Sequence, residues 1–288
     1  MYAGLKLDVK FIDNPQYVEL FEGRDVLQTL WDKGIRALET PVGPNTDRML
    51  LSEHIRICTQ AGFSVSIHPY TELTEYNPSF FRDSQQNPCR HFHEEIFFIA
   101  NEAAVLQKNA ALVNIHPAAD LKTISRKELL DRSVHFYAWA EQWCSEYTPD
   151  VRVSAELQIA ANPEESMVRV GDTFEELEQI SYRSGCGLCW DFGHAYLNNL
   201  RFGSSQVPGP ELIKRIIHVH CHDVNVDDHW PLLTTTSGWD SKLQMLLESG
   251  YDSTVILEIP PKNFLKAGGY SSFEKTVDAL FSVARFQK

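Results

Sequence analysis

The chain has little positive charge. Its 288 residues include 26 lysines and arginines against 39 aspartates and glutamates, which gives a formal net charge of −13. A surface this acidic repels the phosphates of duplex nucleic acid and the head groups of anionic membranes. Tight binding of duplex nucleic acid, or of such a membrane, is therefore not expected.

Long apolar runs and a regular cysteine pattern are also missing. No stretch of about 18 apolar residues occurs, so no membrane-spanning segment is expected. The N-terminus lacks a basic region followed by a long apolar one, so no signal peptide is expected either. Six scattered cysteines in a chain of this size are typical of a reducing compartment. These features together predict a cytoplasmic protein.

Two kinds of functional site can be excluded from short sequence motifs. Cys186 and Cys189 form a C-x-x-C, but the segment reads as a strand, where residues three apart point to opposite faces. A redox or zinc pair is therefore not expected there. No G-x-G-x-x-G and no P-loop follows the first apolar segment, which excludes the usual dinucleotide and nucleotide sites.

Short β-rich runs alternate with longer helical patterns along the chain. The predicted strands span residues 5–11, 35–42, 63–70, 111–117, 151–157, 187–193, 216–224 and 254–259. The predicted helices span residues 23–33, 46–60, 93–108, 126–146, 173–183, 210–215, 239–248 and 272–286. Eight such units in 288 residues predict an α/β fold, a closed (βα)8 TIM barrel, rather than an open doubly wound sheet. With no shift in composition to mark a linker, we expect one domain over residues 1–288.

Six successive predicted strands end in side chains that can bind a metal. They supply His68, His116, Glu156, Asp191 with His194, His220 with Asp227 and His229 downstream, and Glu258. In a (βα)8 barrel the C-terminal strand ends line the active site. Carboxylates inside apolar runs such as RVSAEL and VILEIP are costly to bury unless they are paired or bound to metal. Few lysines or arginines lie near the strand ends, and Lys262 is the main candidate partner for Glu258. A divalent ion would neutralise several carboxylates at once, so the pattern predicts a metal site.

Three of these motifs carry a family resemblance that extends over essentially the whole chain. W-D-F-G-H, H-V-H-C-H-D with D-D-H downstream, and L-E-I-P resemble the motifs of the xylose isomerase-like barrels. That superfamily includes the sugar isomerases and epimerases and endonuclease IV (AP endonuclease family 2). The resemblance to endonuclease IV implies three ions. His68, His116 and Glu156 would hold one; Glu156, Asp191, His220 and Glu258 the central one; and His194, Asp227 and His229 the third.

The resemblance implies two enzymatic functions. The first is a metal-dependent isomerase or epimerase of a small sugar or polyhydroxylated substrate, or a related dehydratase, in which Glu156 and Glu258 serve as acid and base. The second is an endonuclease IV-like trinuclear phosphoesterase, in which Glu156 bridges two ions. The net charge favours the first function, and the complete ligand set favours the second. A non-catalytic binding barrel has no need for so many buried ligands.

Several points stay open in the sequence. The cofactor is expected to be zinc or manganese, in one to three ions. His218, His220 and His222 share a strand face, so only the resemblance favours His220 as the ligand. The stretch DDHWPLLTTTSGW departs from the glycine-rich continuation common in the family. Aromatic residues flank the expected mouth, where they could stack on a sugar or simply pack: Tyr70, Phe192, Tyr196 and Trp230. A homo-oligomer is compatible with the sequence.

Overall fold

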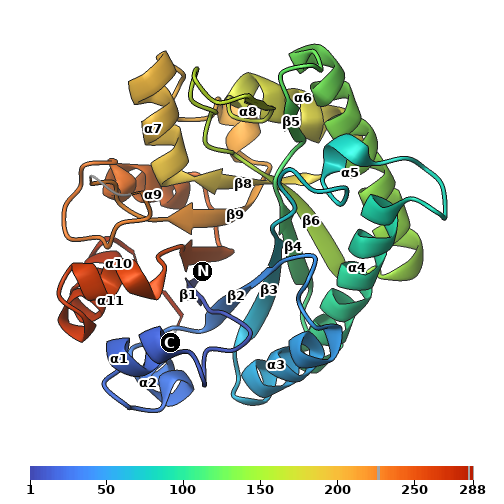
Figure 1. Ribbon diagram of the computed structural model, residues 1–288. Helices are drawn as coiled ribbons and strands as arrows, with labels where there is room; N and C mark the ends of the chain where they lie inside the picture. Colours follow the sequence, from blue (N-terminus) through green and yellow to red (C-terminus); the bar gives the residue numbers. More distant parts are fainter. Residues whose placement is uncertain (226–227, 285, 288) are drawn as a thin grey trace.

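Eight parallel strands form a closed barrel in the computed structural model, which describes residues 1–225, 228–284 and 286–287 (Figure 1). The strands are β1 (Tyr2–Lys6), β2 (Ala37–Val42), β3 (Ser64–Pro69), β4 (Ala111–Ile115), β6 (Val151–Glu156), β8 (Gly187–Asp191), β9 (Ile216–Cys221) and β10 (Thr254–Leu257). Their order around the barrel is β1-β10-β9-β8-β6-β4-β3-β2, and β2 pairs with β1 to close it. The predicted (βα)8 TIM barrel is thus confirmed.

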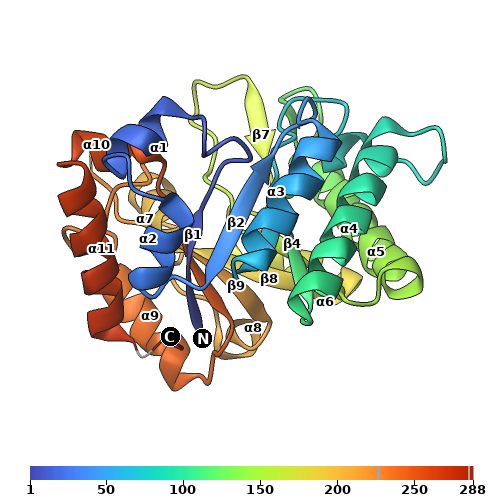
Figure 2. The ribbon, with the colours of Figure 1, turned by 90° about the horizontal axis from the view of Figure 1, so that it is seen from below.

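Helices surround this barrel. The longer ones are α2 (Val26–Asp32), α3 (Arg48–Gln60), α4 (Pro88–Gln107), α5 (Arg126–Tyr147), α6 (Phe174–Ser184), α7 (Phe192–Phe202), α9 (Trp239–Glu248) and α11 (Tyr270–Val283). Shorter elements are α1 (Pro15–Leu20), η1 (Pro78–Phe80), α8 (Pro210–Ile213) and α10 (Pro261–Lys266), with an antiparallel pair of β5 (Ala119–Leu121) and β7 (Met167–Arg169). The chain termini meet at one end, where Gln287 N donates to Met1 O at 3.0 Å (Figure 2).

Side-chain caps explain where many of the helices begin. Asp47 Oδ1 accepts from the amides of Met49 and Leu50 at the start of α3, and Ser125 Oγ accepts from Glu128 N at the start of α5. Such caps satisfy amides that have no partner inside the helix. Among the described helices, none is long and apolar enough to cross a bilayer. All six cysteines are buried and free, so the C-x-x-C forms no disulfide.

Among the differences between the structure and the sequence prediction, two affect the site directly. The first strand was expected over residues 5–11, but β1 ends at Lys6, and a turn closed by Phe11 N→Asp8 O (3.1 Å) follows it. Helix α7 was not predicted, because W-D-F-G-H was assigned wholly to a strand. Asp191 ends that strand and also caps the helix, since its Oδ1 accepts from His194 N at 2.7 Å.

Two buried histidines outside the barrel mouth should make the stability of the fold fall at acidic pH. Burial lowers the pKa of His54 on α3 and of His93 on α4 from 6.5 to about 4. Because the unfolded chain takes up these protons below a pH of about 6.5, stability falls as the pH drops from there towards about 4. We expect each histidine to contribute a loss of about 2 to 3 kcal/mol over that range.

Urea unfolding at pH 7 and pH 4.5, with chelator present, measures this loss. His93→Gln should reduce the pH dependence. His91→Gln is the matched control on the same helix, because the His91 side chain is 71% exposed. Equal pH dependence of His93→Gln and the wild type would contradict the assignment.

Candidate metal centre

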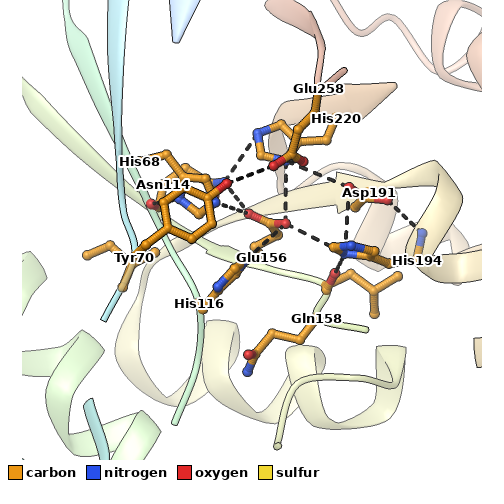
Figure 3. Close-up of polar contacts among 12 residues, drawn as sticks. His68, Tyr70, Asn114, His116, Glu156, Gln158, Asp191, His194, His220 and Glu258 are labelled. Carbon is orange, nitrogen blue, oxygen red and sulfur yellow. Dashed lines mark hydrogen bonds and ion pairs between the residues drawn. The ribbon is translucent and has the colours of Figure 1, made fainter. Parts of the chain in front are cut away.

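The predicted ligands gather at the C-terminal ends of the strands (Figure 3). His68, Glu156, Asp191 and His220 lie on strands β3, β6, β8 and β9; His116 and Glu258 directly follow β4 and β10; His194 lies on α7 and His229 on the loop after β9. Asp227 lies outside the described residues. The structure therefore brings eight of the nine predicted residues to one end of the barrel.

Four of them form a central group: Glu156, Asp191, His220 and Glu258. One ligating atom of each lies within 4.8 Å of the others, and all four residues are at most 3% exposed. His220 Nδ1 lies 2.5 Å from Glu258 Oε2, 3.4 Å from Glu156 Oε1 and 3.8 Å from Asp191 Oδ2. Three carboxylates and an imidazole nitrogen thus face one common point.

The atoms that face this point contact one another but form no well-oriented hydrogen bond. Glu156 Oε1, His220 Nδ1 and Glu258 Oε2 are buried, and none has a hydrogen bond of acceptable geometry within the described part of the chain. Leaving buried polar atoms without such bonds costs free energy, which a divalent cation would offset by binding them all. The donor set, one imidazole nitrogen and three carboxylates, suits zinc or manganese.

In Glu156 and Asp191, the carboxylate oxygen that faces away from this point accepts a hydrogen bond from a neighbouring residue. Asn114 Nδ2 donates to Glu156 Oε2 at 2.5 Å, and Ser154 Oγ in turn donates to Asn114 Oδ1 at 2.7 Å. The amide of His194 donates to Asp191 Oδ1, as described above. These contacts leave the other oxygen of each carboxylate directed towards the common point, which pre-organises the group for a ligand.

The Oε1 oxygen of Glu258 contacts a lysine, but this lysine is Lys6 and not the expected Lys262. The Tyr70 hydroxyl donates to Glu258 Oε1 at 2.8 Å, and the Lys6 ammonium contacts both Glu258 Oε1 and the Tyr70 hydroxyl. The expectation of Lys262 was wrong, because that side chain is exposed on α10. Since β1 ends at Lys6, this side chain reaches the mouth beside β10, to which β1 is paired.

A first flanking group surrounds Glu156. His68 Nε2 lies 3.2 Å from Glu156 Oε2, and His116 Nε2 lies 3.3 Å from Glu156 Oε1. His68 Nδ1 lies 2.7 Å from Asn114 O, so it donates there and its buried, unpartnered Nε2 faces the carboxylate. Burial lowers the pKa of His68 to about 4, which keeps the ring neutral and able to bind a metal at neutral pH.

A second flanking group shares Asp191 with the central group. It comprises Asp191, His194, His222 and His229, whose ligating atoms also lie within 4.8 Å of one another. Asp228 is close to three of them, with 3.8 Å from its Oδ2 to His194 Nε2 and 3.4 Å to His229 Nδ1. His222 and Asp228 were not among the predicted ligands.

His218 and His220 on β9, and His222 directly after it, have distinct surroundings. His218 Nε2 lies 2.7 Å from Glu39 Oε2, and His222 Nε2 lies 3.1 Å from Asp191 Oδ1. Burial opposes protonation of His222, but the charges of Asp191, Asp228 and Glu258 outweigh it and raise the pKa to about 10. Only His220 presents an unpartnered nitrogen to the central group.

His222 fits where it does because residue 193 has no side chain. A Cβ atom on Gly193 would lie 1.9 Å from His222 Cε1, which is closer than real contacts allow. The glycine of W-D-F-G-H therefore lets the His222 ring lie against the first turn of α7 and reach Asp191.

The surroundings of Glu156 and Glu258 favour the ionised form of both carboxylates. Burial alone would raise the pKa of Glu156, but His220, His116 and His68 outweigh it and hold the pKa well below its usual range. For Glu258 the same balance holds, with His220 and Lys6 outweighing burial. Both groups can therefore bind a cation, or accept a proton, at neutral pH.

Comparison with known families settles the classification. The sequence model described as "Xylose isomerase-like TIM barrel" matches residues 34–278, which is most of the chain. The chain belongs to this family. The resemblance seen in the sequence motifs is thus confirmed. A search among proteins of curated function returned no significant match.

Many solved structures share the fold. The 3-keto-D-glucoside 4-epimerase YcjR from E. coli is 14% identical with a TM-score of 0.62, and D-psicose 3-epimerase from Clostridium cellulolyticum H10, solved with D-tagatose, has the same two values. The IOLI protein, solved with a bound zinc atom, is 16% identical with a TM-score of 0.60. Each similarity covers 98% of both chains. At these identities the similarity establishes the fold only.

Sequence reasoning missed three residues that support the central group. Lys6 was placed inside the first strand, and Asn114 carries no metal-binding signal. Of the three, Glu39 could most easily have been predicted from the sequence, because ALETPV places a buried carboxylate in an apolar run just as VILEIP does. Of the aromatic residues expected at the mouth, Tyr70 contacts Glu258, whereas Phe192 is buried and packs on Trp190.

Proposed function

We propose that the chain is a divalent-metal-dependent isomerase or epimerase, or a related dehydratase, of a small sugar or polyhydroxylated substrate. The observation that carries this proposal is the convergence of buried, unpartnered ligand atoms from Glu156, His220 and Glu258, with Asp191 beside them. The names of two structural neighbours, both keto-sugar epimerases, support the substrate class. The zinc atom in a third supports the cofactor.

Glu156 and Glu258 would share the proton transfer. A bound divalent ion would polarise a substrate carbonyl and its neighbouring hydroxyl, which acidifies the C–H between them. Glu156 reaches the site from β6 and Glu258 from β10, with β8 and β9 between them in the barrel. Ionised carboxylates that approach from two directions can remove a proton on one face and return it on the other.

Lys6 and Tyr70 act on Glu258 from the mouth. Their contacts with Oε1 favour the ionised carboxylate, so Glu258 begins the cycle as a proton acceptor. Asn114 has the corresponding place beside Glu156. The low exposure of both glutamates limits the access of water, which would otherwise compete for the proton.

Hydrogen exchange with solvent tests this proposal without knowledge of the natural substrate. A panel of open-chain keto sugars, incubated with the metal-loaded protein in D2O, should acquire deuterium at the carbon next to the carbonyl. Mass spectrometry and NMR locate the label. A chelator should stop the exchange, and Glu156→Gln should slow it by at least about 100-fold, the usual contribution of acid–base catalysis.

A trinuclear phosphoesterase is the second candidate, and the two flanking groups favour it. His68 and His116 lie beside Glu156, and His194 and His229 lie beside Asp191, as a trinuclear site of this kind would need. Asp227, the remaining ligand implied by the resemblance, lies outside the described residues. The net charge of −13 opposes binding of duplex DNA. We therefore expect no incision of a duplex with an abasic site. Three tightly bound ions per chain, chelator-sensitive incision and no deuterium uptake would together overturn the first proposal.

A further inference from the structure

A buried carboxylate below the central group has no role in the chemistry described so far. Glu39 lies on β2, is fully buried, and reaches across the barrel interior to β9, from which β1 and β10 separate it in the barrel order. Its Oε2 lies 2.7 Å from His218 Nε2, and its Oε1 lies 2.8 Å from His220 Nε2. No lysine or arginine among the described residues forms an ion pair with it.

The two histidines are suited to share one carboxylate. His218 and His220 are two residues apart on one strand, so both side chains point into the barrel. Their Nε2 atoms meet different oxygens of Glu39, and their rings cross at 72° with centroids 5.2 Å apart. Oε2 of Glu39 is hydrogen-bonded to His218, whereas Oε1 makes a close polar contact with His220 Nε2 without a hydrogen bond of acceptable geometry.

Both ring nitrogens of His220 face a carboxylate: Nε2 lies 2.8 Å from Glu39 Oε1, and Nδ1 lies 2.5 Å from Glu258 Oε2. A carboxylate only accepts, so a nitrogen that donates to one must carry a proton. An ion bound at one nitrogen would replace the proton there, and the single ring proton of the neutral imidazole would then be on the other nitrogen, Nε2, which faces Glu39. The nitrogen that faces the proposed metal must have its lone pair free. That nitrogen is Nδ1, the buried atom that points to Glu156, Asp191 and Glu258.

We propose that Glu39 is a positioning residue for the metal centre: it holds His220 by Nε2, with His218 anchoring its other oxygen, so that Nδ1 is presented to the metal. This inference rests on the metal centre of the proposed function. A buried carboxylate without a cation is costly, and its retention here is accounted for by the orientation it imposes on a ligand.

The zinc affinity of Glu39 variants tests directly whether Glu39 positions His220. Competition with a chromophoric chelator gives the dissociation constant of zinc. Glu39→Met, which removes the acceptor but keeps the volume, should weaken zinc binding about 10- to 100-fold. Glu39→Gln keeps one acceptor oxygen and should recover part of that loss. A purely structural role would instead lower the melting temperature without this order of affinities.

Thr40→Val is the matched control. Thr40 is the next residue of the same strand, is equally buried, and makes its contact on the opposite side, 2.9 Å from Oγ1 to His54 Nε2. The variant removes one buried polar contact of β2 away from the site. It should bind zinc as the wild type does, even if it melts earlier.

A measurement on the wild type keeps the inference testable if the variants do not fold. Nitrogen NMR of histidine-labelled, zinc-loaded protein should show His220 with its proton on Nε2, assigned by the loss of the signal in His220→Gln. A proton on Nδ1, or unchanged zinc affinity in Glu39→Met, would overturn the role of Glu39. Absence of zinc binding by the wild type would instead overturn the metal centre itself.

Discussion

Glu258→Gln should reduce turnover by at least about 100-fold, the scale of acid–base catalysis. Glutamine keeps the size of the side chain and one acceptor oxygen, but it loses the charge that binds a cation and the basicity that accepts a proton. Because β10 ends at Leu257 and two prolines follow Ile259, residue 258 is at the C-terminal rim of the barrel rather than in the middle of the strand. The deuterium exchange assay measures the loss.

The same variant should also destabilise the fold, since it leaves Lys6 without its carboxylate. Breaking a buried ion pair from one side costs about 3 to 5 kcal/mol, and the 16% exposure of the Lys6 side chain favours the lower end of that range. Loss of activity in the single variant therefore has two sources, chemistry and stability. They are separable because only one of them depends on Lys6.

The double variant Lys6→Met with Glu258→Gln separates them. Removing the unpaired ammonium should restore most of the melting temperature, whereas turnover should stay low. Lys262→Met is the control, because its exposed side chain should affect neither quantity. A double variant with near-normal turnover would show that the Glu258 carboxylate serves only as the partner of Lys6.

The sequence predicted the barrel well because local patterns determine it. Alternation of short apolar runs with amphipathic segments reports directly on βα units, and eight of them suffice to close a barrel. The ends of the strands were predicted less well. The run L-K-L-D-V continues the strand alternation past Lys6, and only the turn that begins at Asp8 ends β1 there.

The gathering of the candidate ligands could be expected from the sequence, but the contacts that support them could not. Position at the end of a strand predicts which residues reach the barrel mouth, and Glu156, Asp191 and Glu258 do lie together there. That position does not show which side chains meet across the barrel. Glu39 and His218 are 179 residues apart in the chain, and their contact depends on the closed geometry of all eight strands. The supporting role of His222 depends in the same way on the close approach of Gly193.

Binding of a divalent ion should raise the melting temperature, and substitutions of His220 and His222 should differ in their effect on that rise. At an ion concentration of about 1,000 times the dissociation constant, binding adds about 4 kcal/mol to the stability. For a chain of this size that corresponds to a rise of about 8 °C, at about 2 °C per kcal/mol. Thermal melts with zinc or manganese and with chelator measure the rise for each variant against its own metal-free form.

His220→Gln should abolish most of this rise, because it removes the nitrogen that faces the three carboxylates. His222→Gln should keep most of it, since His222 contacts Asp191 at Oδ1 and has Asp228 as a second partner. The metal-free melt of each variant cancels any direct loss of stability, so the comparison reports on binding alone. The reverse order of the two variants would place the ligand at His222 and move the ion to the second flanking group, where His194 and His229 are its neighbours.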